Sequence, residues 1–378
     1  MVLLAPGAER AGAMWWGEIR LSPTARCAFR SKNLSERRRR SLTSPYQGTG
    51  RTDTLGDIAH AAQQPASGPT PDDIQPVANE TLDRIVTGLV TIVPVLALGL
   101  VGWQLWGNAL GWNDLFVFGI MYTATGLGIT VGFHRLFTHR SFKTKRSIRL
   151  LLAICGSMAI EGPIVSWVAD HRKHHAFSDQ LGDPHSPHVD HGHGLKGALK
   201  GLAHAHVGWL FVHTQRGNKE RYAPDLLRDP DIAWVDRTFL AWAVAGFVIA
   251  FGLGFAFGGR LVDGFTGMLW GGLVRILVLH HATYSINSLC HFFGRRPFET
   301  GDESRNLAWL APLTFGEAWH NGHHAFPTSA RHGLERWQLD ISAGIIAALE
   351  RTGLAWDVVR VDPAKLAAKR AAASSASG

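Results

Sequence analysis

Three short histidine stretches decide how this chain folds: residues 134–139 (HRLFTH), residues 171–175 (HRKHH) and residues 320–324 (HNGHH). They hold eight of the 20 histidines in a chain of 378 residues. Each stretch lies near the end of an apolar run. Clustered imidazoles are typical metal ligands. Their position beside apolar runs indicates a metal site at the edge of a membrane.

Four apolar segments are long enough to cross a bilayer: residues 85–106, 115–133, 239–257 and 265–286. A hydrocarbon core of roughly 30 Å needs about 20 helical residues. Short connectors with one basic residue, Arg260, join each pair, whereas the N-terminal tail and residues 134–237 are rich in Lys and Arg. The charge bias predicts that both termini and the histidine stretches are cytoplasmic. We expect an all-α integral membrane protein with four transmembrane helices in two hairpins.

A fifth apolar stretch, residues 150–168, must not cross the membrane if the histidines share one site. A crossing would place HRLFTH and HRKHH on opposite faces. The stretch also contains Glu161, Gly162 and Pro163, which are costly or disruptive in a lipid-exposed span. We therefore expect an interfacial helix, or one that dips in and returns. Residues 339–359 suit an amphipathic helix packed on the cytoplasmic domain.

The chain is expected to have three parts. Residues 1–79, with four arginines in a row at 37–40 and no sustained periodicity, predict a disordered basic tail. Residues 80–360 form the membrane domain, and residues 361–378 a flexible C-terminal tail. The net charge of +8 fits membrane topology, and no motif for nucleic-acid binding accompanies it, so we expect no nucleic-acid partner. Cys27, Cys155 and Cys290 are too scattered for a disulfide framework.

The spacing of the histidines predicts a metal centre. In HRKHH and HNGHH they fall at i, i+3 and i+4, so a helix presents all three on one face. In HRLFTH they fall at i and i+5, about 140° apart on an ideal helix, so the rings approach from different angles or the helix distorts. Asn287 and His291 are four residues apart, making His291 a ninth ligand and Asn287 a direct or water-mediated one. The nine histidines are His134, His139, His171, His174, His175, His291, His320, His323 and His324.

Nine imidazoles exceed what one metal ion takes, so two ions are implied. Imidazole suits zinc, copper, iron and nickel, so ligand type alone does not choose the metal. Candidates to orient the rings are the carboxylates Glu161, Asp170, Asp183 and Glu317. Four further histidines are expected to be ordinary satisfied polar residues: His60, His204, His213 and His332. Four more are expected in a solvated loop: His185, His188, His191 and His193.

Over about residues 82–359, the chain resembles the membrane-bound fatty acyl desaturases, specifically the delta-9 acyl-CoA (stearoyl-CoA) type. The resemblance rests on GFHRLFTHRSF, WVADHRKHHAFSD followed by GDPHSPH, NSLCHFFGRRPF and GEAWHNGHHAFP. It implies four transmembrane helices beneath a cytoplasmic helical cap that holds two iron ions. Carried over residue by residue, it implies the same nine histidines as the catalytic metal ligands, with Asn287 acting through water.

The family reaction inserts a cis double bond into a saturated acyl chain, using O2 and two electrons and releasing water. An unactivated methylene has no acidic proton, so the metal must supply the oxidising chemistry. The resemblance implies long-chain acyl-CoA as the substrate. The sequence has neither a cytochrome b5 signature nor an iron–sulfur cysteine pattern. We therefore expect a separate electron donor of the ferredoxin, flavin reductase or cytochrome b5 type, and a location in the inner membrane if the source is bacterial.

The resemblance also implies where the acyl chain lies. It places the bend of the chain near Trp167, Thr283 and Tyr284, although the animal enzymes have Trp where this chain has Tyr284. It places the closed end of the tunnel near Tyr122 and Gly126 on the second span. We expect the small Gly126 to admit a chain of about stearoyl length, while helix packing is an equally good explanation for a glycine in a membrane helix.

Three other functions remain open. A membrane di-iron hydroxylase of alkyl or lipid substrates would need different histidine spacing and would lack the NSxxH pattern. A metal transporter would place its ligands near the bilayer midplane. The hydroxylase is the nearest rival, and an acyl-lipid (phospholipid) desaturase is also possible. The basic residues that could hold CoA phosphates could equally form a basic cytoplasmic face: Lys196, Lys200, Arg216, Lys219 and Arg221.

Overall fold

The computed structural model describes residues 68–107 and 110–376. Residues 1–67, which hold Cys27, His60 and most of the predicted N-terminal tail, lie outside the described residues. Helices make up almost all of the regular structure in the described part. Its two strands, β1 (Lys143–Thr144) and β2 (Ala355–Trp356), form one short antiparallel pair. The predicted all-α class is confirmed.

Four helices are long and apolar enough to cross a membrane: Glu80–Trp106, Trp112–Thr138, Phe239–Gly258 and Leu261–His291. The first is α1 and the third is α9. The second consists of α2 (Trp112–Leu127) and the π-helix η3 (Gly128–Thr138). The fourth consists of α10 (Leu261–Met268), the π-helix η6 (Leu269–Val274), α11 (Arg275–Ser288) and the 3-10 turn η7 (Leu289–His291). The four apolar spans predicted from the sequence are confirmed as helices.

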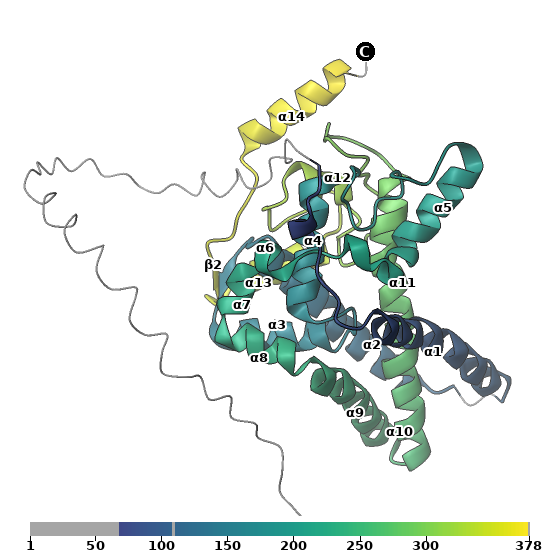
Figure 1. The fold of residues 1–378 in the computed structure, drawn as a ribbon. Helices are drawn as coiled ribbons and strands as arrows, with labels where there is room; N and C mark the ends of the chain where they lie inside the picture. Colours follow the sequence, from purple (N-terminus) through teal and green to yellow (C-terminus); the bar gives the residue numbers. More distant parts are fainter. Residues whose placement is uncertain (1–67, 108–109, 377–378) are drawn as a thin grey trace, which may run out of the picture. The chain divides into compact units, whose positions relative to one another are not determined.

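Small residues let these helices pack closely. α9 lies beside α10, and α2 contacts α9, α10 and η6 (Figure 1). A Cβ atom on Gly254 would lie 2.3 Å from the carbonyl oxygen of Asp263, and one on Gly267 would lie 2.7 Å from the Cα of Gly254. Glycine at both positions therefore permits the backbones of α9 and α10 to approach, as is common between membrane helices.

The HRLFTH stretch lies where the second long helix widens into a π-helix. The backbone N–H of His139 donates to the carbonyl of His134 at 3.1 Å, a bond that spans five residues. Residues at i and i+5 therefore share one face, and the ring centroids of His134 and His139 are 4.8 Å apart. Of the two possibilities the sequence left open, the distorted helix is the one found. π-Helical turns of this kind are frequent at functional sites.

The single helix predicted for residues 150–168 is wrong, because two helices occupy this region: α3 (Arg146–Ser157) and α4 (Ile164–Phe177). Gly162 has a left-handed φ of 114°, and Pro163 precedes the first residue of α4. A proline lacks the N–H that would continue the earlier helix, so the chain turns at this point. The turn gives α4, which carries HRKHH, its own direction.

The remaining helices are short. They are η2 (Pro71–Asp73), α5 (Gly194–His206), η4 (Gly208–Phe211), η5 (His213–Gln215), α6 (Lys219–Tyr222), α7 (Pro224–Arg228), α8 (Pro230–Arg237), α12 (His320–Ala325), α13 (Ile341–Arg351) and α14 (Pro363–Ala376). The amphipathic helix expected at residues 339–359 is the shorter α13, which begins after Asp340 caps it at the N–H of Ala343. Where a flexible tail was expected, the structure has α14, whose Lys369 donates to the carbonyl of Ala325 at 3.0 Å.

The main hydrophobic core lies where η3, α3 and α4 meet. Phe133, Ala153 and Val168 are fully buried there. The backbones of η3 and α3 touch at two glycines, because a Cβ on Gly128 would lie 2.1 Å from the backbone nitrogen of Gly156. This contact fixes the π-helix against α3.

We predict that Gly128→Ala lowers the free energy of unfolding by about 1–3 kcal/mol, because the added methyl group must push two backbones apart. Gly119→Ala is the matched control, since Gly119 lies on the same long helix with open space around its Cα. Thermal unfolding of the detergent-solubilised variants measures the difference. Equal stability of both variants would show that the two glycines are not in tight contact.

Candidate metal centre

The nine histidines singled out from the sequence come from four elements. His134 lies in η3 and His139 follows it, α4 carries HRKHH, His291 ends the fourth long helix, and α12 carries HNGHH. Their ring nitrogens form two groups, and the candidate ligand atoms within each group lie within 4.8 Å of one another. The first group is His134, His139, His171, His175 and His323, and the second is His174, His291, His320 and His324.

In the first group the Nε2 atoms face one another. The Nε2 atom of His323 lies 2.9 Å from that of His175 and 3.2 Å from that of His134. The Nε2 atoms of His171 and His175 are 3.1 Å apart. The Nε2 atom of His139 is buried and has no hydrogen-bond partner among the described residues. These contacts come from η3, α4 and α12, so the group joins segments that are far apart in the sequence.

The second group has the same arrangement. The Nε2 atom of His320 lies 3.0 Å from the Nε2 atoms of both His291 and His324. The Nε2 atoms of His174 and His324 are 3.4 Å apart. This group therefore joins α4, the end of the fourth long helix and α12.

Carboxylates hold the outer nitrogens of four of these rings. The Nδ1 atoms of His134 and His174 lie 2.6 Å and 3.0 Å from oxygens of Glu317 and Asp183. Those of His291 and His324 lie 2.8 Å from Asp179 and 2.8 Å from Asp302, respectively. A carboxylate accepts the Nδ1–H, which leaves the lone pair of each ring on Nε2.

This arrangement of protons tests whether the residues fit a metal ion. His174, His291 and His324 all have Nδ1 on a carboxylate, so their Nε2 atoms present lone pairs to one another and to His320. Lone pairs do not hydrogen-bond to lone pairs. A cation at the centre of each group satisfies all of them, and neutral imidazole is a common ligand of transition metals. The donor set therefore fits a metal cofactor.

Burial keeps three of these rings neutral. Desolvation, followed by the charge of neighbouring imidazoles, lowers the pKa of His171, His175 and His323 well below the ordinary value. Although burial alone acts in the opposite direction, the His324 imidazole holds the pKa of Asp302 below its usual range. Neutral imidazoles beside ionised carboxylates are the protonation states that metal binding requires.

Two of the four expected carboxylates, Asp183 and Glu317, contact the rings of the nine histidines. Asp170 instead binds Arg216 at 2.8 Å, and Glu161 accepts hydrogen bonds from Thr283 and Trp167. The carboxylates missed from the sequence are Asp179 and Asp302. Asp179 follows HRKHH by four residues, which is a usable signal. Asp302 lies in a loop that no spacing connects to His324.

Two histidines that seemed ordinary in the sequence also lie at the site. His185 is buried and its ring centroid is 4.3 Å from that of His174. His332 is fully buried, and its ring centroid is 4.4 Å from that of His323. The expectation that His185 lies in a solvated loop and that His332 is an ordinary satisfied polar residue was therefore wrong, because long-range folding brings both segments to the histidine cluster.

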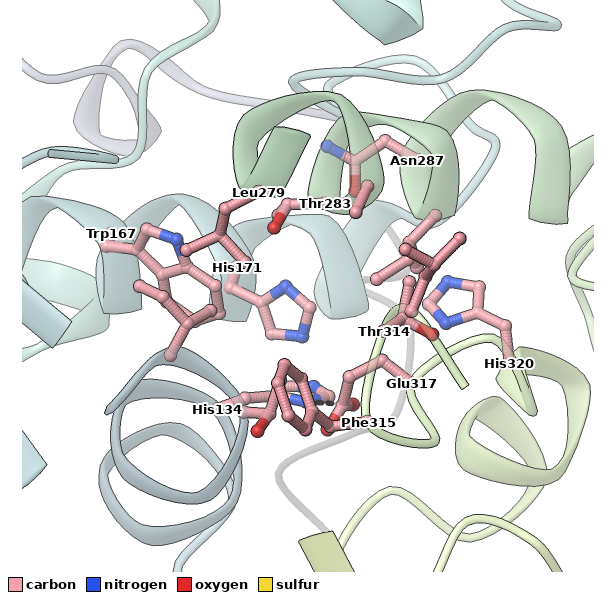
Figure 2. Close-up of a pocket in the computed structure, with 15 residues that line it drawn as sticks. His134, Trp167, His171, Leu279, Thr283, Asn287, Thr314, Phe315, Glu317 and His320 are labelled. Carbon is pink, nitrogen blue, oxygen red and sulfur yellow. Dashed lines mark hydrogen bonds and ion pairs between the residues drawn. The ribbon is translucent and has the colours of Figure 1, made fainter. Parts of the chain in front are cut away.

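A partly open cavity lies beside both groups. Figure 2 shows the rings of His134, His171 and His320 around it, with Thr283 and Asn287 on α11. Trp167 also lines this cavity, and its ring stacks on His171 at a centroid distance of 5.2 Å (Figure 2). Most of the other lining side chains are apolar: Ile129, Leu279, Ala282, Ile286, Leu313 and Phe315.

Three other residues were expected to contact the acyl chain, and none of them lines this cavity. Tyr284 lines a second cavity, which shares Trp167 and Thr283 with the first. Tyr122 and Gly126 do not line either cavity. The hydroxyl of Tyr122 donates to the carbonyl of Leu313 at 2.7 Å. A Cβ atom on Gly126 would lie 2.3 Å from the ring of Phe315.

We predict that the purified chain retains about two transition-metal ions, one for each group. His139→Ala and His291→Ala should each lower the content by about one ion, because each removes a ligand from a different group. His206→Ala is the control, since the His206 ring bonds to Ser288 and His281 and belongs to neither group. Elemental analysis measures the ratio. Equal metal loss in all three variants would contradict separate sites.

The comparisons with known proteins agree with this geometry. The profile of the family "Fatty acid desaturase" matches residues 110–356. A hex-5-enoyl-[acyl-carrier protein] acetylenase of Moorena producens (strain JHB) is 47% identical over 239 residues, 63% of this chain and 74% of that protein. An sn-1 stearoyl-lipid 9-desaturase of Anabaena variabilis is 39% identical, over 66% of this chain and 86% of the relative. An icosanoyl-CoA 5-desaturase of Limnanthes douglasii is 37% identical, over 65% of each protein.

The matched region contains all three histidine stretches, the cavity and three of the four long apolar helices. The family, the apolar helices and the paired imidazole groups together identify a membrane protein with a metal cofactor. The chain belongs to the fatty acid desaturase family and is an oxygen-dependent oxidoreductase that desaturates fatty acyl chains.

Proposed function

We propose that this chain inserts a cis double bond at the delta-9 position of a saturated long-chain acyl-CoA, using O2 and two iron ions. The observation that supports this most directly is the apolar cavity that runs directly beside two imidazole groups. A saturated acyl chain needs an apolar wall, and its unactivated methylenes need a metal. The cavity offers both at one place.

Iron, when bound, would supply the oxidising chemistry that breaks the two C–H bonds. We assign the nine histidines as its ligands, with Asn287 as a direct or water-mediated ligand. The chain's other residues hold and orient these ligands. Asp179, Asp183, Asp302 and Glu317 keep the Nδ1–H atoms turned outward, and Trp167 packs on His171. Thr283 and the apolar side chains keep the acyl carbons beside the metal centre and exclude water.

The reaction determines what else must reach the site. The acyl chain loses two hydrogen atoms, and O2 takes up these with two electrons and two protons to give two water molecules. No cysteine cluster among the described residues can carry electrons, as Cys155 and Cys290 are free. We therefore propose a separate donor of the ferredoxin, flavin reductase or cytochrome b5 type.

We also propose four membrane passes, with both termini and the metal centre on the cytoplasmic side. Two features support this orientation. His139 follows the second long helix and His291 ends the fourth, so both mark the same end of the two hairpins. The charge bias of the sequence places that end in the cytoplasm. If the source is bacterial, the membrane is the inner one.

One observation favours a second substrate class, an acyl group on a membrane lipid. Of the basic residues that could hold CoA phosphates, Arg216 is paired with Asp170 at 2.8 Å and Arg221 with Asp73 at 3.0 Å. Their charges are therefore already balanced. The names of the relatives also include lipid and acyl-carrier-protein substrates. The carrier must be decided by experiment.

The deciding experiment supplies membranes that contain the chain with O2, a reducing system and labelled stearoyl groups on CoA, on acyl carrier protein or on phospholipid. We predict oleoyl product from stearoyl-CoA, identified by gas chromatography and mass spectrometry. His320→Ala should be inactive. Product from the lipid alone would replace acyl-CoA with acyl-lipid, a double bond elsewhere would overturn the delta-9 assignment, and a hydroxylated chain would overturn desaturation.

Gly126 should influence chain length through Phe315. Because a Cβ at residue 126 would meet the Phe315 ring, Gly126→Ala should push that ring into the cavity it lines. We predict a shift in preference from stearoyl toward palmitoyl substrates, larger still for Gly126→Phe. The double variant Gly126→Ala with Phe315→Leu should restore the stearoyl preference. Unchanged product lengths in both single variants would contradict this assignment.

A further inference from the structure

The segment around His332 is fixed against the metal centre by a buried network. The backbone N–H groups of His332 and Gly333 donate to Asp340 Oδ2 at 2.7 Å and 3.1 Å. Arg135, fully buried, binds Asp340 at 2.9 Å and the carbonyl of Ala330 at 2.8 Å. A Cβ on Gly322 would lie 2.6 Å from the carbonyl oxygen of His332, so this backbone also touches α12. The position of His332 is therefore well defined.

The ring of His332 shares a carboxylate with one of the ligand histidines. Its Nδ1 atom lies 3.0 Å from Glu317 Oε2, the same oxygen that lies 2.6 Å from the Nδ1 atom of His134. Arg135 binds the other oxygen, Oε1, at 3.1 Å. An ionised carboxylate has enough lone pairs to accept from both rings and from Arg135.

This sharing fixes the tautomer of His332. Its Nδ1 atom lies beside a carboxylate oxygen, which can only accept, so the proton of a neutral ring belongs on Nδ1. With its proton on Nδ1 facing Glu317, its Nε2 atom is a lone pair. Both ring nitrogens of His332 are buried and make no hydrogen bond among the described residues, although Nδ1 lies 3.0 Å from Glu317 Oε2.

The ring of His323 has a donor that lacks an acceptor. Its Nε2 atom faces His134 and His175 in the first group, so its proton lies on Nδ1 when Nε2 holds a metal ion. That Nδ1 atom is also buried without a partner in the described part of the chain. The rings of His323 and His332 are 4.4 Å apart and inclined by 38°. The unpaired Nδ1–H of His323 therefore belongs to a ring that packs on the ring of His332, whose Nε2 lone pair has no donor.

We propose that His332 is a positioning residue that couples two metal ligands of the first group, donating Nδ1–H to Glu317 beside His134 and accepting Nδ1–H from His323 on Nε2. This inference rests on the proposed metal centre. His332 does not bind the metal. It orients His134 through Glu317 and His323 directly, and it does not touch the second group.

The test uses the iron-loaded chain and two readouts other than activity: the Mössbauer spectrum of 57Fe and the rate at which a chelator removes iron. In His332→Phe, the iron of one site should change its spectrum and leave about 10- to 100-fold faster, since loss of an outer partner weakens metal binding by this much. The iron of the other site should keep its spectrum. His332→Gln can donate and accept through its amide, and should restore most of both properties.

His213→Phe is the matched control, because His213 is a buried histidine beside the carboxylate of Asp83 at 2.9 Å, and it belongs to neither group of ligands. It should leave both iron sites unchanged. A wild-type spectrum and wild-type iron retention in His332→Phe would overturn the inference. If His332→Phe does not fold, His332→Leu takes its place, and its wild-type behaviour would have the same meaning.

These readouts separate the inference from the proposed function. A chain that shows the His332 effect but forms no double bond would overturn the function and support the inference. A chain that forms oleoyl product with iron sites indifferent to His332 would do the reverse.

Discussion

The structure depends on turning neutral, buried imidazole lone pairs toward two common points. A buried polar group without a partner is unfavourable by about 1–3 kcal/mol, so such convergence is stable only around cations. The Nε2 atom of a ring points toward the centre of its group only if the Nδ1 atom on the other side of the ring is held in place. Each carboxylate that does this is itself fixed: Asp183 accepts from two backbone N–H groups, Asp302 accepts from the N–H of Ser304, and Glu317 is bound by Arg135.

Two local departures from regular helix bring the ligands together. The π-helix η3 aligns His134 with His139, which a regular α-helix would place on different faces. The break between α3 and α4 gives α4 its own direction, so that HRKHH meets the other stretches. The contact of Gly128 with Gly156 fixes the first of these departures to α3, so the shape of the core and the geometry of the metal centre are set by the same helices.

Much of the helical structure and most of the metal ligands could be predicted from the sequence, because local periodicity encodes them. Apolar length predicted the four long helices, and i, i+3, i+4 spacing predicted which histidines would share a helix face. Contacts between distant segments have no such signature. Asp302 lies beside His324, and His332 beside His323, only because loops return from elsewhere. The break at Gly162 and Pro163 had a local signal, although the sequence analysis treated it as an irregularity within one helix.

The same logic separates the chemistry from the specificity of this enzyme. We propose that the imidazole groups provide for oxidation of the acyl chain, while the packing of Phe315 against Gly126 limits its length. The central claim is that two metal ions lie within the nine imidazoles. Anomalous diffraction at the iron edge from crystals of the iron-loaded chain tests it most directly. We predict two peaks, one within each histidine group; a single peak, or peaks outside these groups, would contradict the account.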